Sequence, residues 1–198
     1  MVDYIVDLMR IMLAGLPGYL LLRAFWLKWR PGKRGENTGT KECPVQYSRE
    51  IFMGIFVLFM LALVTFVCQG EYSSIPDMLK LAKERVEHGT GINLVPFRTI
   101  SNYYRHFGIY GDLFWVNIAG NVLMFVPWGF GLLFLWKKNR KLYRLIFFSI
   151  MFPVGIEFVQ LFINRQVDID DIILNFLGGL LGGLIYWLFF RNTKFAQH

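Results

Sequence analysis

The chain has few of the residues that build disulfide scaffolds and metal centres. It contains two cysteines and three histidines among 198 residues. Cys43 falls in a basic loop and Cys68 at the opposite end of the next apolar run, so they are expected on opposite sides of a membrane and cannot form a disulfide. His88, His106 and His198 lack the spacing of metal-ligating pairs. The sequence therefore predicts no metal site and no cofactor.

Three further absences narrow the class of protein. No nucleophilic side chain stands beside a recognisable base, which disfavours covalent catalysis. The net charge is +7, but the basic residues lie in loops and form no basic face, so nucleic acid is not an expected partner. The N-terminal segment carries Asp3 and Asp7 where a signal peptide has a basic leader. We expect this segment to stay in the protein.

Hydrophobic residues are abundant: they make up 55% of the chain, aromatic residues make up 18%, and the mean hydropathy is +0.42. A hydrocarbon core about 30 Å thick needs roughly 20 helical residues. Five windows satisfy this requirement, at about 4–27, 50–69, 113–136, 142–163 and 170–190. The sequence predicts an all-α, polytopic membrane helix bundle of about five transmembrane helices.

Positively charged loops predict the orientation of these helices. Lysines and arginines gather between residues 28 and 49 and between 137 and 144, and Arg191 and Lys194 follow the last span. Such loops stay cytoplasmic, which places the N-terminus outside and the C-terminus inside. We divide the chain into a first helix with a basic cytoplasmic linker (1–49), the main membrane domain (50–190) and a cytoplasmic tail (191–198).

The loop at 70–112 should carry a short amphipathic helix on the outer surface. Ser74 and Asp77 resemble an N-cap pair, and Pro76 suits the first helical turn. Apolar residues between 78 and 86 then alternate with a polar face. That polar face consists of Lys80, Lys83, Glu84, Arg85 and Glu87.

Polar residues near the outer ends of the last three spans give the strongest functional signal. They form three pairs, each on one helix face: Asn117 with Asn121, Glu157 with Gln160, and Asp171 with Asn175. At 1.5 Å per residue, all six lie within roughly 10 Å of the outer helix ends. Polar groups in a membrane are costly unless they pair. We therefore expect one outward-opening polar chamber, over which Arg98 or Arg165 folds.

Small residues should close the inner half of the bundle. Gly178 with Gly182, and Gly179 with Gly183, form overlapping small-xxx-small pairs below Asn175, where a neighbouring helix can approach closely. Prolines inside three of the spans permit bends that widen one end. The expected shape is a funnel that opens outward.

Together these motifs resemble the VanZ-like family. The resemblance rests on the Asn93–Phe97 loop, Gly120-Asn121 followed by Phe125, Pro127 and Gly129, the Glu157-x-x-Gln160 step, Arg165, and Asp171-x-x-x-Asn175 leading into Gly178 and Gly182. It covers about 50–190 and leaves out 1–49. It implies a bacterial cell membrane protein associated with resistance to teicoplanin-type lipoglycopeptide antibiotics, and it implies no catalytic mechanism.

Structural explanations compete with functional ones at several positions. The buried asparagines could simply tie helices together, each bond contributing about 0.6 kcal/mol. Asp168 and Asp170 are expected only to cap the fifth helix, whose dipole favours carboxylates at its N-terminus. Glu157 differs, because neither a cap nor a surface pair explains a carboxylate inside a span. We expect Glu157 to be functional.

Three classes of function remain open. We favour a protein that binds or shields a membrane lipid or lipid-linked cell-wall precursor, with a lipoglycopeptide antibiotic as a further candidate partner. Its expected ligand-binding residues are Asn93, Arg98, Asn117, Asn121, Glu157, Gln160, Arg165, Asp171 and Asn175. One alternative is a lipid-headgroup enzyme in which Glu157 is the general base and Asp171 either orients it or holds Mg²⁺. The other is a proton-coupled transporter, which the lack of an inverted repeat disfavours.

Overall fold

The computed structural model describes residues 2–29, 47–69 and 74–192. These residues form two compact units, Val2–Ala62 and a larger one that starts at Leu63. Most of the basic linker expected before residue 49, including Cys43, lies outside the described residues, as does the end of the expected tail. The division into residues 1–49, 50–190 and 191–198 stays a prediction.

The smaller unit pairs α1 (Val2–Trp29) with the first part of α2 (Tyr47–Val67). The ring of Tyr19 lies against Gly54, where the missing side chain leaves room for it. Arg23 on α1 forms an ion pair with Glu50 near the N-terminus of α2. α1 continues through Pro17 as a single helix. Ring packing and the ion pair therefore join the two helices of this unit.

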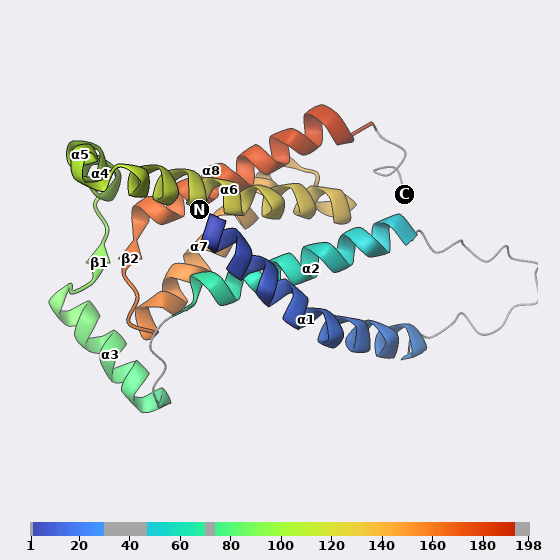
Figure 1. Ribbon diagram of the computed structural model, residues 1–198, viewed down its shortest axis with the longest axis horizontal. Coiled ribbons are helices and arrows are strands. Elements are labelled where there is room, and N and C mark those ends of the chain that lie inside the picture. Colours follow the sequence, from blue (N-terminus) through green and yellow to red (C-terminus); the bar gives the residue numbers. More distant parts are fainter. Residues whose placement is uncertain (1, 30–46, 70–73, 193–198) are drawn as a thin grey trace, which may run out of the picture. The chain divides into compact units, whose positions relative to one another are not determined.

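The larger unit is built on three long helices, α6 (Asp112–Leu135), α7 (Leu142–Phe162) and α8 (Ile169–Ile185). α8 packs against both of the others, and α6 and α8 lie side by side (Figure 1). Gly178 and Gly182 face backbone carbonyls of α6 so closely that a Cβ would not fit, and Gly129 faces the backbone of Gly179. The close approach expected along the glycine stripe is confirmed.

α7 has one buried face and one exposed apolar face. Leu145, Ser149 and Pro153 are fully buried at intervals of four residues. The opposite face keeps large apolar side chains exposed: Phe147, Met151, Val154 and Phe158. Leu145 packs with Leu133 and Tyr186 in a buried core. This core lies at the end of the bundle where the short helix Lys137–Asn139 connects α6 to α7. Exposed apolar side chains on such a hydrophobic helix suit contact with lipid chains.

Four helices of the described chain are long and apolar enough to cross a membrane. Their apolar segments are Glu50–Val67, Leu113–Leu135, Leu142–Phe162 and Ile169–Phe190. They correspond to the second to fifth expected spans, and these four predictions are confirmed. The first expected span, 4–27, falls in α1, several of whose side chains lie outside the described residues, so it stays a prediction.

Short elements connect the spans at one end of the larger unit. They are α3 (Ile75–His88), β1 (Ile92–Asn93), α4 (Arg98–Arg105), α5 (Phe107–Tyr110) and β2 (Val167–Asp168). The expected amphipathic helix is confirmed as α3, with Ser74 as N-cap and Gly89 as a left-handed C-cap. The sequence did not predict α4 and α5. Figure 1 shows β1 running from α3 to α4, next to β2.

Candidate functional site

The polar end of the larger unit, defined as residues 89–111 and 163–171, brings two distant loops together. β1 and β2 pair in parallel, with Asn93 opposite Asp168. The backbone N–H of Val167 donates to the carbonyl of Gly91 at 2.9 Å. β1 leads towards α4 and β2 leads into α8, so the pairing sets where both helices begin (Figure 1).

Asp168 caps α8 and also holds the loop that contains Asn93. Its Oδ1 accepts from the backbone N–H of Asp170 at 2.9 Å and from Nδ2 of Asn93 at 2.9 Å. Its other oxygen accepts from the hydroxyl of Thr99. The predicted cap is confirmed. The same carboxylate also fixes the position of α4, a role that the sequence did not reveal.

Asp170 caps a different helix from the one expected. Its carboxylate accepts from the backbone N–H groups of Thr99 at 2.8 Å and Ile100 at 3.1 Å, and from that of Phe97. These are the first amides of α4, whose N-cap residue, Phe97, has a φ of 62° and no capping side-chain bond. The expectation that Asp170 serves only α8 is wrong. Its negative charge faces the positive end of the α4 dipole.

Glu157 lies inside α7 and is 4% exposed. Its Oε2 accepts from the backbone N–H of Asp168 at 2.9 Å, because the turn after α7 folds back over the helix end. This bond ties α7 to the beginning of α8. Glu157 lines neither of the two pockets described below, and its role in ligand binding stays a prediction.

The asparagine side chains of α6 and α8 have different partners. Nδ2 of Asn121 donates to Oδ1 of Asp171 at 2.7 Å and so links α6 to α8. Nδ2 of Asn117 donates to the carbonyl of Leu113 in its own helix at 2.9 Å. Asn175 is 5% exposed, and its Oδ1 has no partner among the described residues. Asn121 therefore ties two helices together and Asn117 does not.

Arg85 is a central contact that sequence analysis missed. The pattern of α3 places it on the polar face, yet it is 5% exposed, and burial lowers the pKa of its guanidinium. It donates to five backbone carbonyls: Thr90 (3.3 Å), Gly91 (2.8 Å), Gln160 (3.2 Å), Leu161 (2.9 Å) and Arg165 (2.5 Å). Because it follows Met78 and Ala82 at helical spacing on the apolar face, the sequence did carry a signal for its burial.

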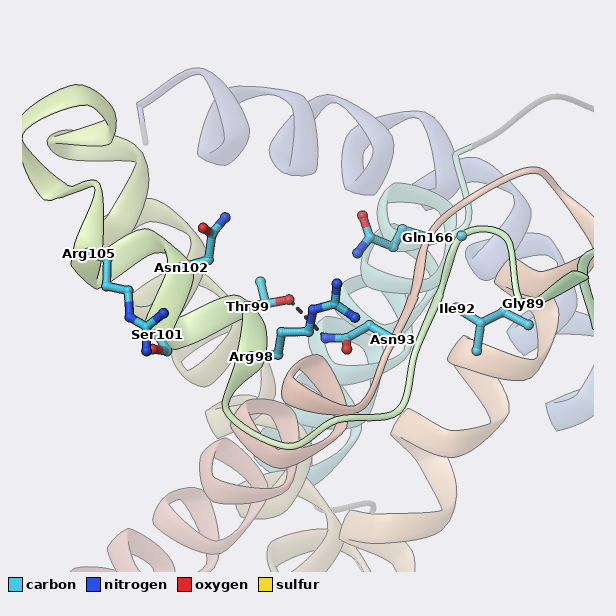
Figure 2. Close-up of a pocket in the computed structure, with 10 residues that line it drawn as sticks. Gly89, Ile92, Asn93, Arg98, Thr99, Ser101, Asn102, Arg105 and Gln166 are labelled. Atoms are coloured by element: carbon cyan, nitrogen blue, oxygen red, sulfur yellow. Dashed lines mark hydrogen bonds between the residues drawn. The ribbon is translucent and has the colours of Figure 1, made fainter.

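A pocket of about 660 Å³ opens between β1 and α4, and we call it the arginine pocket. Its polar side chains come from one face of α4, where Arg98, Ser101, Asn102 and Arg105 recur at helical spacing, and from Asn93, Thr99 and Gln166. Figure 2 shows Gln166 across from α4, with Arg98 and Thr99 between it and Arg105. No carboxylate stands among the described lining residues. Arg105 was not predicted, although this spacing could have revealed it.

A second pocket of about 280 Å³, the carboxylate pocket, adjoins the first. It is lined by Thr99, Tyr103, Gln160, Asn164, Arg165, Gln166, Asp168 and Asp171. Thr99 and Gln166 line both pockets. The nine predicted ligand-binding residues therefore divide: Asn93 and Arg98 line the first pocket, Gln160, Arg165 and Asp171 line the second, and Asn117, Asn121, Glu157 and Asn175 line neither.

Potential metal ligands form no metal-binding group in the part of the chain that the structure describes. Within residues 2–29, 47–69 and 74–192, no group of three or more histidine, cysteine, aspartate or glutamate side chains could hold a metal ion. The carboxylates of the polar end mostly accept from amides and a hydroxyl instead. The described side chains thus offer hydrogen-bonding chemistry at two pockets.

Four apolar spans and a polar end built on their connections define a polytopic helical membrane protein. The sequence model of the VanZ/LLP1 family matches residues 55–190 of the chain. The chain therefore belongs to the VanZ/LLP1 family. The matched region contains all four of these spans almost completely, both pockets and the glycine-lined interface between α6 and α8. No curated protein and no solved structure shows significant similarity to the chain.

Proposed function

We propose that this VanZ-family protein binds the phosphate of a cell-envelope lipid headgroup, or of a lipid-linked cell-wall precursor, in the arginine pocket. By holding or shielding that lipid, it would reduce susceptibility to teicoplanin-type lipoglycopeptides. One observation carries the proposal: Arg98 and Arg105 line a polar pocket of about 660 Å³ that has no carboxylate among its described lining residues. Two positive charges there have no counter-charge in the pocket.

The chemistry of the pocket favours phosphate over other anions. A guanidinium presents its N–H donors as a planar fork that matches two phosphate oxygens. Arg98 and Arg105 lie seven residues apart, two turns along α4, so both can face the same ligand. The side chains of Asn93, Ser101 and Asn102 add neutral donors at the edge. Together they suit a group with several anionic oxygens.

The position of the pocket supports a lipid ligand. α4 and α5 immediately precede the apolar segment Leu113–Leu135, and Gln166 lies just after the segment Leu142–Phe162. Both boundaries fall where hydrocarbon gives way to headgroups. Large apolar side chains nearby, including Val95, Phe97 and Ile109, are exposed and can contact acyl chains. A headgroup could enter the pocket while its chains stay in the bilayer.

The alternative functions have less support. A general base must reach the proton that it abstracts, whereas Glu157 is buried, bonded to the N–H of Asp168 and outside both pockets. A proton-coupled transporter needs polar groups that continue through the bundle, and glycines and apolar side chains occupy the other half of the α6–α8 pair. Lipid binding, unlike catalysis or proton transport, needs only the side chains at the polar end.

The test is teicoplanin susceptibility of a sensitive Gram-positive host that expresses each variant at matched membrane levels. Arg98→Ala combined with Arg105→Ala should abolish protection, because two charge-assisted contacts are lost. Lys80→Ala is the matched control, since it removes an exposed positive charge from α3, outside the pocket. Full protection by the double variant at normal expression would refute a phosphate site in this pocket.

The proposal also requires the polar end to face outward, with the N-terminus outside and the C-terminus in the cytoplasm. Ser101→Cys should react with an impermeant maleimide in intact cells, and Asn139→Cys should not. Cys43 is replaced by serine in both proteins. Cys68 is buried, and burial raises the pKa of its thiol, so it should react slowly at pH 7. If Asn139→Cys alone were labelled, the orientation would be the opposite of the one proposed, and the site would not lie on the outer surface.

A further inference from the structure

The carboxylate pocket holds an acceptor that no described residue satisfies. Gln160 is 5% exposed and lines the pocket. Its Nε2 donates to the carbonyl of Val67 at 2.9 Å, which fixes the orientation of the amide. Its Oε1 is buried and has no hydrogen-bond partner among the described residues. Burying an acceptor without a hydrogen bond is unfavourable, so this atom favours a ligand that carries a donor.

Asp171 supplies a second acceptor in the same pocket. Asn121 donates to its Oδ1, and no described residue donates to its Oδ2. Asp168 also lines the pocket, but both of its oxygens already accept hydrogen bonds. Arg165 is the only cation among the described lining residues, against two carboxylates. With both carboxylates ionised the pocket has one negative charge in excess, which favours a cation.

The two pockets share a boundary, so one ligand can reach both. Thr99 and Gln166 line each of them. The hydroxyl of Thr99 donates to Asp168, which places the side chain of Thr99 beside the carboxylates, and its backbone N–H donates to Asp170. In Figure 2, Thr99 and Gln166 stand beside Arg98, at the edge of the arginine pocket. A positively charged site and a negatively charged site are thus adjacent.

We infer that the carboxylate pocket binds the protonated primary amine of the same headgroup whose phosphate lies in the arginine pocket. The ligand would be a zwitterionic aminoalkyl phosphate. Its ammonium N–H groups would donate to Oε1 of Gln160 and Oδ2 of Asp171, while Arg98 and Arg105 bind the phosphate. This inference rests on the proposed phosphate site and goes further, because it requires N–H donors a few atoms from the phosphate.

Binding of three lipids to the purified full-length chain tests the inference. Native mass spectrometry would compare phosphatidylethanolamine, phosphatidylcholine and phosphatidylglycerol of identical acyl chains, dispersed in the same detergent. The choline headgroup keeps the positive charge but has no N–H donor, and the glycerol headgroup has no amine. Phosphatidylethanolamine should bind about tenfold more tightly than either, the difference expected for one charge-assisted hydrogen bond.

Variants test whether the preference for phosphatidylethanolamine arises in the carboxylate pocket. Asp171→Asn should lower the affinity for phosphatidylethanolamine relative to phosphatidylglycerol about tenfold, while Asn121 can still donate to the new side chain. Asp77→Asn on α3 is the control, because Asp77 is exposed and bonds only within its own helix cap. If Asp171→Asn fails to fold, the comparison of the three lipids on the unaltered protein still decides.

The outcomes separate this inference from the proposed function. Equal affinity for the ethanolamine and choline lipids would overturn the amine site. If in that case the double variant Arg98→Ala, Arg105→Ala bound none of the lipids, the proposed phosphate site would still be supported. If all three lipids bound with equal affinity, and the double arginine variant bound them as tightly as the unaltered protein, both the amine site and the phosphate site would be overturned. Water-soluble aminoethyl phosphate carries the same two groups: weaker binding than the lipid supports a lipid ligand, and equal binding supports the amine site with a soluble ligand.

Discussion

The two ends of the α6–α8 pair are held together in different ways. At one end, Gly178 and Gly182 place the backbone of α8 directly against carbonyls of α6. At the other end, Asn121 and Asp171 bridge the same two helices through side chains, at 2.7 Å. Asn175 lies between these regions and keeps a buried Oδ1 without a described partner. Backbone contact leaves no space for a ligand, whereas side-chain bridges leave room for pockets.

The polar end is held mainly by tertiary capping of helix termini. Arg85 donates to carbonyls at the end of α7, and Asp170 accepts from amides at the beginning of α4. Glu157 accepts from the backbone N–H of the residue before α8. Helix termini leave such groups without partners inside the helix. Each charged side chain therefore satisfies the backbone of another element, which positions the two pockets.

Removing Arg85 should cause the greatest loss of stability. Arg85→Ala removes the guanidinium donor from five carbonyls, of which those of Gly91 and Gln160 keep backbone donors. One hydrogen bond to a charged group contributes about 1.5–3 kcal/mol. We expect unfolding in detergent to be easier by at least about 3 kcal/mol. Arg85→Lys should restore little of the lost stability, because an ammonium group cannot reproduce the planar, forked arrangement of the guanidinium N–H donors. Lys83→Ala, which removes only an exposed pair with Glu87, should change stability by less than about 0.5 kcal/mol.

Gly129→Ala tests the backbone contact at the other end. The new Cβ would overlap the carbonyl of Gly179, so the helices must separate, and overpacking of this kind costs about 1–3 kcal/mol. Gly120→Ala in the same helix meets no atom within 4 Å and should be neutral or stabilising by up to about 1 kcal/mol. Thermal unfolding in detergent measures both. Equal stability of the two variants would show that α6 and α8 do not approach so closely.

Asp170→Asn should loosen α4 and lower the global stability by about 2 kcal/mol, less than Arg85→Ala. The substitution replaces one carboxylate oxygen by an NH₂ group, which cannot accept from the backbone N–H donors of α4, so these donors lose an acceptor. Hydrogen exchange at Thr99 and Ile100 should quicken, and phosphate binding should weaken with it. Unchanged exchange at these two amides would contradict the cap.

Asn121→Ala should have the smallest effect. Interhelical hydrogen bonds in membranes contribute about 0.6 kcal/mol on average and up to about 1.7. Asn117→Ala is its control, because Asn117 donates only to a carbonyl of its own helix. A double-mutant cycle of Asn121→Ala with Asp171→Asn isolates the bond. A coupling energy of zero would mean that this bridge does not hold the polar end together.

The position of Arg85 illustrates the limit of sequence reasoning at this site. Its charge and the alternating pattern of α3 favour an exposed face. Arg85 is buried instead, because three of the five carbonyls that it binds belong to residues 75 or more positions away, which the local pattern cannot reveal. Arg105 differs, because its i, i+3, i+4 and i+7 spacing with Arg98, Ser101 and Asn102 can be read along the chain once α4 is recognised as a helix. Asp168 was correctly placed as a cap, since capping depends on local sequence.

By itself, the sequence determined the membrane class, four spans, the glycine-lined packing and the family resemblance. These depend on composition and on spacing within one helix, and both can be read along the chain. Only the tertiary structure decided that Glu157 accepts from Asp168, that Asp170 caps α4 and that the polar residues surround two adjoining pockets. The direction of a side chain at a helix end depends on which distant backbone group is left unsatisfied, and only the folded arrangement of loops sets that.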